Sequence, residues 1–339
     1  MVSASASSLK NNEELLIFPT YGHLSSDHKS WLISIHGIVY EPEEGSRLRD
    51  GLVTFLGKLI HLKKDELHNP FFRERARLFV VDNERGKGIS IALQGKNYKL
   101  KRTLPNGHIK DTLTVPSEIF PLSQSLNWIP VESISLGEDR RVFQGKLQLI
   151  GEEGVSVISD IDDTIKITEV TDRKAMLHNT FLKEFQPVSG ISEVYQSWQK
   201  SGTVFHYVSA SPWQLFLPLS KFMEKEGFPP GIFHLKHFRW KDSSFFALFE
   251  SPERYKREVI EPILRDFPKR RFILVGDSLE KDPEIYGQLA REHADQITHI
   301  FIRDADEKSD DARYKIAFKN LPSSLWTVFS NPSEMALSQ

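Results

Sequence analysis

The sequence predicts an α/β fold with a parallel sheet and flanking helices, preceded by a mostly β, sandwich-like N-terminal domain. Up to about residue 150, short β-prone runs are separated by turn residues at a spacing typical of a sandwich. From residue 155 onward, strand-like apolar runs alternate with long helical patterns, which indicates a parallel sheet. We therefore divide the chain into an N-terminal extension (1–28), a β-rich domain (29–152) and an α/β domain (153–330).

The β-rich domain is predicted from a period-two alternation of apolar and polar residues, the pattern of strands with one buried face. The runs that show it are 32–42, 76–82, 88–94, 97–104 and 146–153. Asn106-Gly107 favours a hairpin, because type I′ turns need positive φ at both central residues. An apolar stripe with helical spacing predicts a helix over 47–60 within this domain.

The α/β domain contains nearly continuous apolar runs, which are typical of strands buried on both faces. These runs are 155–159, 203–209, 272–276 and 298–303. The helical patterns between them are 191–201, 213–227, 253–267 and 282–294. Gly202 directly follows the first helix, where a C-capping glycine is expected.

Composition excludes several classes of protein. The chain has 44 basic and 46 acidic residues, so it lacks the basic excess of a dedicated nucleic-acid-binding protein. It has no cysteine, which excludes disulfides, thiolate zinc sites and a cysteine nucleophile. No apolar run approaches the ~20 residues of a transmembrane helix, and the N-terminus has no signal-peptide pattern. We expect a cytoplasmic protein that meets any membrane only peripherally.

Polar residues follow several of the predicted buried strands. Asp160 and Asp162 come after the first strand, Ser209 ends the second, and Asp277 follows the 272–276 strand, with Asp282 five positions later. Ligands of parallel sheets bind beyond the carboxyl ends of the strands. We therefore expect these side chains to meet at one edge of the sheet.

So many carboxylates need charge compensation. Two like charges 4 Å apart repel by about 4 kcal/mol at an effective dielectric constant of 20. The four aspartates can therefore converge only around a cation or when some of them are protonated. An all-oxygen site without His or Cys suits Mg²⁺. A metal ion beside a free carboxylate suits phosphoryl transfer, because the metal neutralises phosphate oxygens while the carboxylate approaches phosphorus.

The ordered motifs resemble the haloacid dehalogenase (HAD) superfamily. Within it, the chain is most similar to the phosphatidate phosphatase family typified by the fungal actin patch protein. The matching motifs are DIDDTIKIT (160–168), YVSASPW (207–213), FPKRRFILVGDSLEKDPEIY (267–286) and IFIRDA (300–305). The resemblance covers residues 155–305 and implies a HAD-like Rossmannoid sheet.

This resemblance implies a role for each of the polar residues. Asp160 would be the nucleophile, forming an aspartyl-phosphate, and a Mg²⁺ ligand. Asp162 would be the general acid and then the general base, and would ligate the metal through its backbone carbonyl. Ser209 would bind a phosphoryl oxygen. Asp277 would be the second metal carboxylate, and Asp282 a metal ligand through water or an orienter of one.

Lys256 is the candidate for the catalytic lysine, because it heads a helical pattern with an apolar inward face. The apolar positions on that face are Ile260, Ile263 and Phe267. An inward lysine would neutralise the nucleophile and the phosphoryl group; the alternative is a lysine that snorkels from a helix start. Lys236 and Lys241 are the substitutes for this role.

Neighbouring residues have supporting interpretations. Asp163 is expected to cap the turn after the first motif, or else to tune the metal site. Thr164 is expected to shape the same loop. Arg303 and Asp304 either reach the rim of the site or form a surface ion pair. His234 and His237 have HxxH spacing, but no third ligand is near, so no zinc site is expected.

Two segments bear on the substrate. Residues 164–188 allow a small cap but not a full cap domain, which suits a bulky lipid phosphate and equally a protein phosphate. The segment 228–249 combines seven Phe and Trp residues with Lys and Arg, a composition that suits contact with an anionic membrane. The alternative for this segment is that its rings pack in the core.

The resemblance implies a Mg²⁺-dependent phosphatidate phosphatase, a phosphoric monoester hydrolase of lipid metabolism that releases diacylglycerol and phosphate at a membrane surface. The first alternative keeps the chemistry and changes the substrate to a soluble phosphomonoester or a phosphoprotein. The second is a non-catalytic scaffold built from the sandwich and the HAD-like domain. The intact set of costly acidic residues argues against a scaffold.

Overall fold

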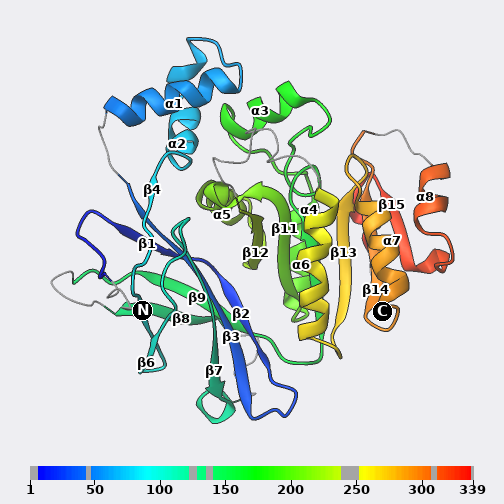
Figure 1. Ribbon diagram of the computed structural model, residues 1–339. Coiled ribbons are helices and arrows are strands. Elements are labelled where there is room, and N and C mark those ends of the chain that lie inside the picture. The colour runs from blue at the N-terminus through cyan, green and yellow to red at the C-terminus, as the bar shows by residue number, and fades with distance from the viewer. Residues whose placement is uncertain are drawn as a thin grey trace. The chain divides into compact units, whose positions relative to one another are not determined.

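The computed structural model describes residues 7–42, 47–121, 128–134, 140–237, 252–306 and 311–336 (Figure 1). The chain separates into two compact units. The first unit comprises Met1–Leu52 and Val80–Glu152, and the second comprises Val53–Phe79 and Glu153–Gln339. The predicted α/β fold preceded by a mostly β region is confirmed.

The first unit is built on a nine-stranded sheet, counted over the described residues. Its strands are β1 (Glu14–Ile17), β2 (Thr20–Leu24), β3 (Ser30–Glu41), β4 (Asp82–Asn83), β5 (Ser90–Leu93), β6 (Lys96–Lys99), β7 (His108–Pro116), β8 (Trp128–Ile134) and β9 (Gln144–Leu149). They run in the order β1-β3-β2-β9-β8-β5-β6, and β4 and β7 also pair with β3. The β2–β9 pair is parallel, whereas β3 pairs antiparallel with β1, β2, β4 and β7.

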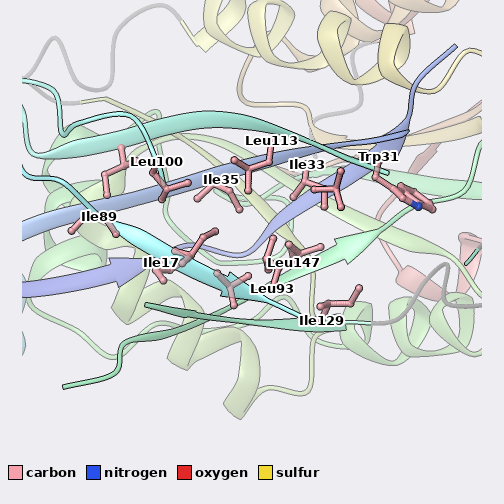
Figure 2. Close-up of a cluster of buried hydrophobic side chains, with 14 of the residues drawn as sticks. Ile17, Trp31, Ile33, Ile35, Ile89, Leu93, Leu100, Leu113, Ile129 and Leu147 are labelled. Atoms are coloured by element: carbon pink, nitrogen blue, oxygen red, sulfur yellow. The ribbon is translucent and has the colours of Figure 1, made fainter. Parts of the chain in front are cut away.

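Alternate residues of these strands form the apolar core of the first unit. On β3, Trp31, Ile33 and Ile35 are buried, and they pack in one cluster with residues of β5 and β9 such as Leu93 and Leu147 (Figure 2). The indole N–H of Trp31 donates to the backbone oxygen of Phe120 at 2.8 Å, so the ring's one polar atom is satisfied. The apolar positions of the period-two pattern thus identify the face of the sheet that is buried.

The expected N-terminal extension and the predicted Asn106-Gly107 hairpin both need correction. Strands β1 and β2 lie within residues 1–28, so much of the expected extension belongs to the sheet. Gly107 has φ +73° but Asn106 does not have positive φ, so the turn is not type I′. It leads from β6 to β7, which pair with different strands, β5 and β3. Short strands give too little periodicity for the sequence to show their partners.

Of the run 76–82, predicted to be a strand, residues 76–77 end a helix, 78–81 form turns and bends, and only Asp82 lies in a strand, β4. Helix α2 (Pro70–Arg77) begins after Asn69, whose side chain accepts from the N–H of Phe72 at 3.1 Å. An Asn N-cap followed by proline is a strong helix start, and here it overrides the β-prone residues that follow. Residues 53–79 belong to the second unit, although the sequence analysis places them in the β-rich domain. The predicted helix over 47–60 is confirmed as α1 (Arg47–Leu59).

Among its described residues, the second unit contains a six-stranded, fully parallel sheet in the order β12-β11-β10-β13-β14-β15. Its strands are β10 (Val155–Asp160), β11 (Val204–Pro212), β12 (Ile232–Lys236), β13 (Arg271–Asp277), β14 (Ile297–Arg303) and β15 (Trp326–Phe329). The helices that follow in this unit are α3 (Arg173–Phe181), α4 (Ile191–Lys200), α5 (Phe216–Lys225), α6 (Pro252–Asp266), α7 (Asp282–Glu292) and α8 (Asp311–Ala317). The four apolar runs predicted as strands are confirmed. No helix in the described ranges is long and apolar enough to cross a bilayer.

The strand order determines where the polar strand ends meet. Strand β10 lies between β11 and β13, with Asp160 paired to Val208 and Ser159 paired to Val275. The chain leaves β10 toward β11 and β12 on one side and later adds β13 on the other, so the connections change direction at β10. Such a switch point opens a crevice at the carboxyl edge of a parallel sheet.

A buried histidine in this sheet, His206, should make the stability of the second unit depend on pH. Nδ1 of His206 on β11 lies 3.3 Å from Nε2 of His234 on β12. Burial, and then His234, hold the pKa of His206 well below its usual value. Between the two pKa values, His206 binds a proton in the unfolded chain but not in the folded chain. Stability is therefore lost as pH falls below the unfolded pKa of about 6.5.

We expect His206→Leu to remove this loss, which amounts to at most about 1.4 kcal/mol between pH 7.5 and 5.5. The measurement is urea unfolding of the wild type and the variant at both pH values. His293→Leu, a histidine with no such burial, is the matched control and should keep the wild-type pH dependence. Equal pH dependence in His206→Leu and the wild type would contradict the assignment.

Candidate active site

The nucleophile predicted from the sequence is the last residue of β10. Asp160 is buried, with 1% of its surface exposed. Its Oδ2 accepts from the hydroxyl of Thr164 at 3.2 Å, and its Oδ1 lies 3.3 Å from Nζ of Lys256. Thr164 thus contacts the carboxylate directly, a closer role than the loop-shaping one expected from the sequence.

Asp163 shapes the loop that follows β10. Its backbone is left-handed, with φ +53°. Its carboxylate accepts from the backbone N–H groups of Thr168, Glu169 and Val170, each at 2.8 Å. The expected capping role of Asp163 is confirmed, because three otherwise orphaned donors end on one carboxylate.

The carboxylate of Asp162 is held by four donors. Oδ1 lies 2.8 Å from Nζ of Lys166 and accepts from the hydroxyl of Thr168 at 2.8 Å. Oδ2 accepts from the hydroxyls of Ser209 and Ser211 at 2.7 Å and 2.9 Å. Burial by itself raises the pKa of Asp162, but Lys166 and these hydrogen bonds outweigh it and hold the pKa at about 2. Asp162 is therefore ionised in this arrangement.

The hydroxyl of Ser209 can donate one hydrogen bond, and in this arrangement it donates that bond to Asp162. Its Oγ also accepts from the N–H of Ser211 at 2.9 Å. A hydroxyl donates only one hydrogen bond. Ser209 can therefore donate to a phosphoryl oxygen, the role implied by the family resemblance, only by releasing Asp162.

The strand β13 ends in a second acidic loop. Oδ1 of Asp277 accepts from the N–H groups of Leu279 and Glu280, at 2.6 Å and 3.1 Å. Its Oδ2 is buried and has no hydrogen-bond partner among the described residues. Asp282, the first residue of α7, accepts from the N–H of Asp277 at 3.2 Å. A Cβ on Gly276 would lie 2.3 Å from Oδ2 of Asp282, so only glycine permits this close approach.

Lys256 lies among three carboxylates. Its Nζ is 3.3 Å from Asp160, 2.8 Å from Glu280 and 2.5 Å from Asp282. The side chain is fully buried. Burial alone lowers the pKa of Lys256, but Asp160, Asp282 and Glu280 raise it well above its usual value, so the ammonium stays charged. The inward helix face expected from the sequence is confirmed, because Ile260, Ile263 and Phe267 are buried beside it.

Oxygen atoms of Asp160, Asp277 and Glu280 all lie within 4.8 Å of one another. Burial, and then the neighbouring carboxylates, raise the pKa values of Asp160 and Asp277 well above the usual range. Among the residues that the structure describes, Lys256 alone does not offset so many carboxylates, and one oxygen of Asp277 has no donor. The donor set and this orphaned atom fit a hard divalent cation that prefers oxygen ligands.

The structure thus groups the candidate metal ligands differently from the sequence analysis. It brings Asp160 and Asp277 together with Glu280, a residue that the sequence analysis did not single out. The side chains of Asp162 and Asp282 contact other groups: the lysine and hydroxyls described above, and Lys256 with the N–H of Asp277. Metal ligation by the backbone carbonyl of Asp162, and by Asp282 through water, stays a prediction. Glu280 lies three positions after Asp277, where only its place in an acidic loop at a strand end could have pointed to it.

The remaining candidates have other surroundings. Arg303, at the end of β14, donates to the backbone oxygen of Asp163 at 2.6 Å and so supports the first loop. Lys236 ends β12, and Lys241 lies outside the described residues. In the segment 228–249, Phe228 and Phe233 are buried, and residues 238–249 lie outside the described ranges.

The second unit thus has a parallel sheet whose connections change direction at β10, with acidic loops after β10 and after its neighbour β13. Residues 155–304 match the family described as "Phosphatidate phosphatase APP1, catalytic domain". The chain is 42% identical over 154 residues to "Phosphatidate phosphatase APP1" of Saccharomyces cerevisiae, across 44% of this chain and 26% of that protein. The family resemblance predicted from the sequence is confirmed for this segment.

Other comparisons found further similar proteins. An uncharacterized protein of Schizosaccharomyces pombe is 31% identical over 197 residues, across 55% of this chain and 32% of that protein. The chain thus spans about a quarter to a third of the length of these curated relatives. Among solved structures, a putative β-phosphoglucomutase from Thermotoga maritima has a TM-score of 0.32 at 12% identity and covers 53% of this chain and 96% of its own.

Removal of the charge of Lys256, the cation that the described residues place in the acidic cluster, should destabilise the second unit. We expect Lys256→Met to lower the free energy of unfolding by about 3–5 kcal/mol, because it leaves buried carboxylates unpaired. Urea unfolding measures the change. Lys200→Met, on an exposed position of α4, should cost less than about 1 kcal/mol. The double variant Lys256→Met/Asp160→Asn should recover part of the loss; full additivity would contradict the pairing.

Proposed function

We propose that the chain is a Mg²⁺-dependent phosphatase that hydrolyses phosphatidate to diacylglycerol and phosphate through an aspartyl-phosphate on Asp160. The observation that carries the proposal is the cluster of the buried Asp160 and Asp277 with the half-buried Glu280 beside Lys256, at the carboxyl ends of adjacent parallel strands. The match of residues 155–304 to the phosphatidate phosphatase family favours the lipid substrate. Because phosphatidate resides in membranes, we expect a cytoplasmic protein that works peripherally at a membrane surface.

The proposed Mg²⁺ site consists of Asp160, Asp277 and Glu280. The oxygen-only donor set, the partnerless Oδ2 of Asp277 and the excess of carboxylates over cations support this assignment. When bound, Mg²⁺ neutralises phosphate oxygens, so that an anionic carboxylate can approach phosphorus. The remaining steps rest on side chains of this chain.

In the first proposed step, a carboxylate oxygen of Asp160 forms a bond to phosphorus while the bond from phosphorus to the lipid oxygen breaks. Thr164 fixes the second oxygen of Asp160, and Lys256 offsets the negative charge of the nucleophile and the phosphoryl group. The departing alkoxide takes a proton from the carboxyl group of Asp162 and leaves as the alcohol.

In the second step, Asp162 takes a proton from a water molecule that attacks phosphorus, and the bond between phosphorus and Asp160 breaks. The ionised state of Asp162 in the structure suits this step. The first step needs a proton on Asp162. When the phosphoryl group enters, Ser209 donates its hydrogen bond to a phosphoryl oxygen and no longer to Asp162, and the phosphoryl group adds negative charge nearby. Both changes raise the pKa of Asp162.

The nucleophile is tested by phosphate release from phosphatidate in mixed micelles with Mg²⁺. We expect Asp160→Asn to reduce kcat/KM by at least about 10³-fold, because the amide cannot accept the phosphoryl group. Asp295→Asn, at an exposed loop position, should retain wild-type activity. If the wild type hydrolyses a small aryl phosphate but not phosphatidate, the lipid substrate is contradicted. If it hydrolyses neither ester, the proposed phosphatase activity is contradicted.

The metal site is tested by the thermal midpoint in Mg²⁺ and in EDTA. We expect Mg²⁺ to raise the midpoint of the wild type, because an ion that binds only the folded state stabilises it. Asp277→Asn should be at least as stable as the wild type in EDTA, since it removes a buried charge with an unsatisfied oxygen. It should also lose the Mg²⁺ response, whereas Asp295→Asn should keep it. A full Mg²⁺ response in Asp277→Asn would contradict the assignment.

A further inference from the structure

Helix α2 binds the end of α3, although the two helices are far apart in the sequence (Figure 1). The side-chain amide of Asn69 donates to the backbone oxygen of Leu182 at 3.0 Å. The guanidinium of Arg75 donates to the backbone oxygen of Thr180 at 2.6 Å. The last carbonyls of a helix lack partners within the helix and carry the negative end of its dipole. Residues 69–75 therefore cap α3 from outside.

Aromatic rings support the same contact. The rings of Phe72 and Phe79 lie 6.5 Å and 5.7 Å from the ring of Phe181, the last residue of α3. All three rings are buried. Segment 69–79 is thus a packed part of the second unit, although the chain between β3 and β4 supplies it.

Arg75 is buried, and the acidic residues Glu74 and Glu184 act on its charge only from beyond ion-pair distance. Only 4% of its surface is exposed, and it forms no ion pair with the residues that the structure describes. Its guanidinium carbon instead lies 3.9 Å from the ring centre of Phe185. Burial lowers the pKa of Arg75 to about 10, so it remains charged at neutral pH. A cation held against a ring in a desolvated position interacts strongly with it.

The same ring contacts a second cation, which leads to the site. Nζ of Lys166 lies 5.0 Å from the ring centre of Phe185 and 2.8 Å from Oδ1 of Asp162. A continuous series of contacts therefore joins Arg75, Phe185, Lys166 and Asp162. This series ends on Oδ1 of Asp162. The donors to Oδ2 are Ser209 and Ser211, from the strand whose serine the phosphoryl group would engage.

We propose that Arg75, Phe185 and Lys166 are positioning residues for Asp162 in the proposed phosphatase reaction. Ser209 must release Oδ2 when it donates to a phosphoryl oxygen, because it has one proton. Lys166 then still holds Oδ1, and it is itself held by Phe185, which packs under Arg75. The carboxyl group of Asp162 stays directed at the leaving oxygen. Part of this apparatus lies outside residues 155–304, the segment that matches the family.

Leaving-group dependence distinguishes positioning of Asp162 from a general structural role. The full chain is assayed with Mg²⁺ on 4-nitrophenyl phosphate and on phenyl phosphate. The parameter kcat/KM covers the steps up to phosphoryl transfer. Because 4-nitrophenolate departs readily without a proton and phenolate does not, Asp162→Asn should lower kcat/KM for phenyl phosphate much more than for 4-nitrophenyl phosphate.

We expect Lys166→Met, Phe185→Leu and Arg75→Met to change the ratio of the two kcat/KM values in the same direction as Asp162→Asn. The change should be about tenfold for Lys166→Met and about threefold for Arg75→Met, a fraction of the 10²–10⁴ that a general acid supplies. Lys166→Arg should restore most of the wild-type ratio. Arg77→Met, an exposed arginine on the same helix, is the matched control and should leave the ratio unchanged.

Thermal midpoints show whether each variant is folded. If Lys166→Met does not fold, Phe185→Leu tests the positioning role in its place. An active wild type whose ratio is unchanged in folded variants, or whose two kcat/KM values fall equally, overturns the positioning role alone. A wild type that releases no phosphate from either ester or from phosphatidate overturns the proposed function and this role with it.

Discussion

The second unit depends on one buried ammonium group among many carboxylates. Lys256 contacts Asp160, Glu280 and Asp282, and it has no exposed surface. Like charges at this separation repel strongly, and the lysine between the loops after β10 and β13 reduces this repulsion. The parallel sheet provides the scaffold, since its central strand and the neighbouring strand end at the same edge. The remaining uncompensated charge at Asp277 is what makes the cluster suited to a divalent cation.

A second constraint is the number of protons on the hydroxyls around Asp162. Ser209 donates its hydrogen bond to Asp162 in this arrangement, and it cannot donate to a phosphoryl group at the same time. Arrival of the substrate and release of the acid–base group are therefore one event in the proposed mechanism. The other oxygen of Asp162 keeps its donors, Lys166 and Thr168, throughout. Water alone does not compete for Ser209 as strongly as a charged phosphoryl oxygen does, because charge-assisted hydrogen bonds are the stronger ones.

Those features that depend on local pattern were predictable from the sequence. Continuous apolar runs identified the buried strands, and the face of α6 placed Lys256 inward. The contacts of Glu280 and the membership of α2 were not predictable, because both depend on tertiary structure. Glu280 lies in a loop without periodicity, and Asn69-Pro70 announces a helix but not the unit in which it packs. The short strands β1 and β2 failed to appear for a related reason: four or five residues show too little alternation.

The position of α2 also bears on how the chain acquires its structure. The hydrogen bond from Arg75 to Thr180 joins residues 105 positions apart. During synthesis α2 therefore leaves the ribosome well before the helix that it caps, and its apolar face has no lasting partner until α3 follows. Contacts of such long sequence separation form late, because the intervening loop must close first. Because the chain passes from the first unit to the second and back before its final return, neither unit corresponds to one uninterrupted stretch of coding sequence.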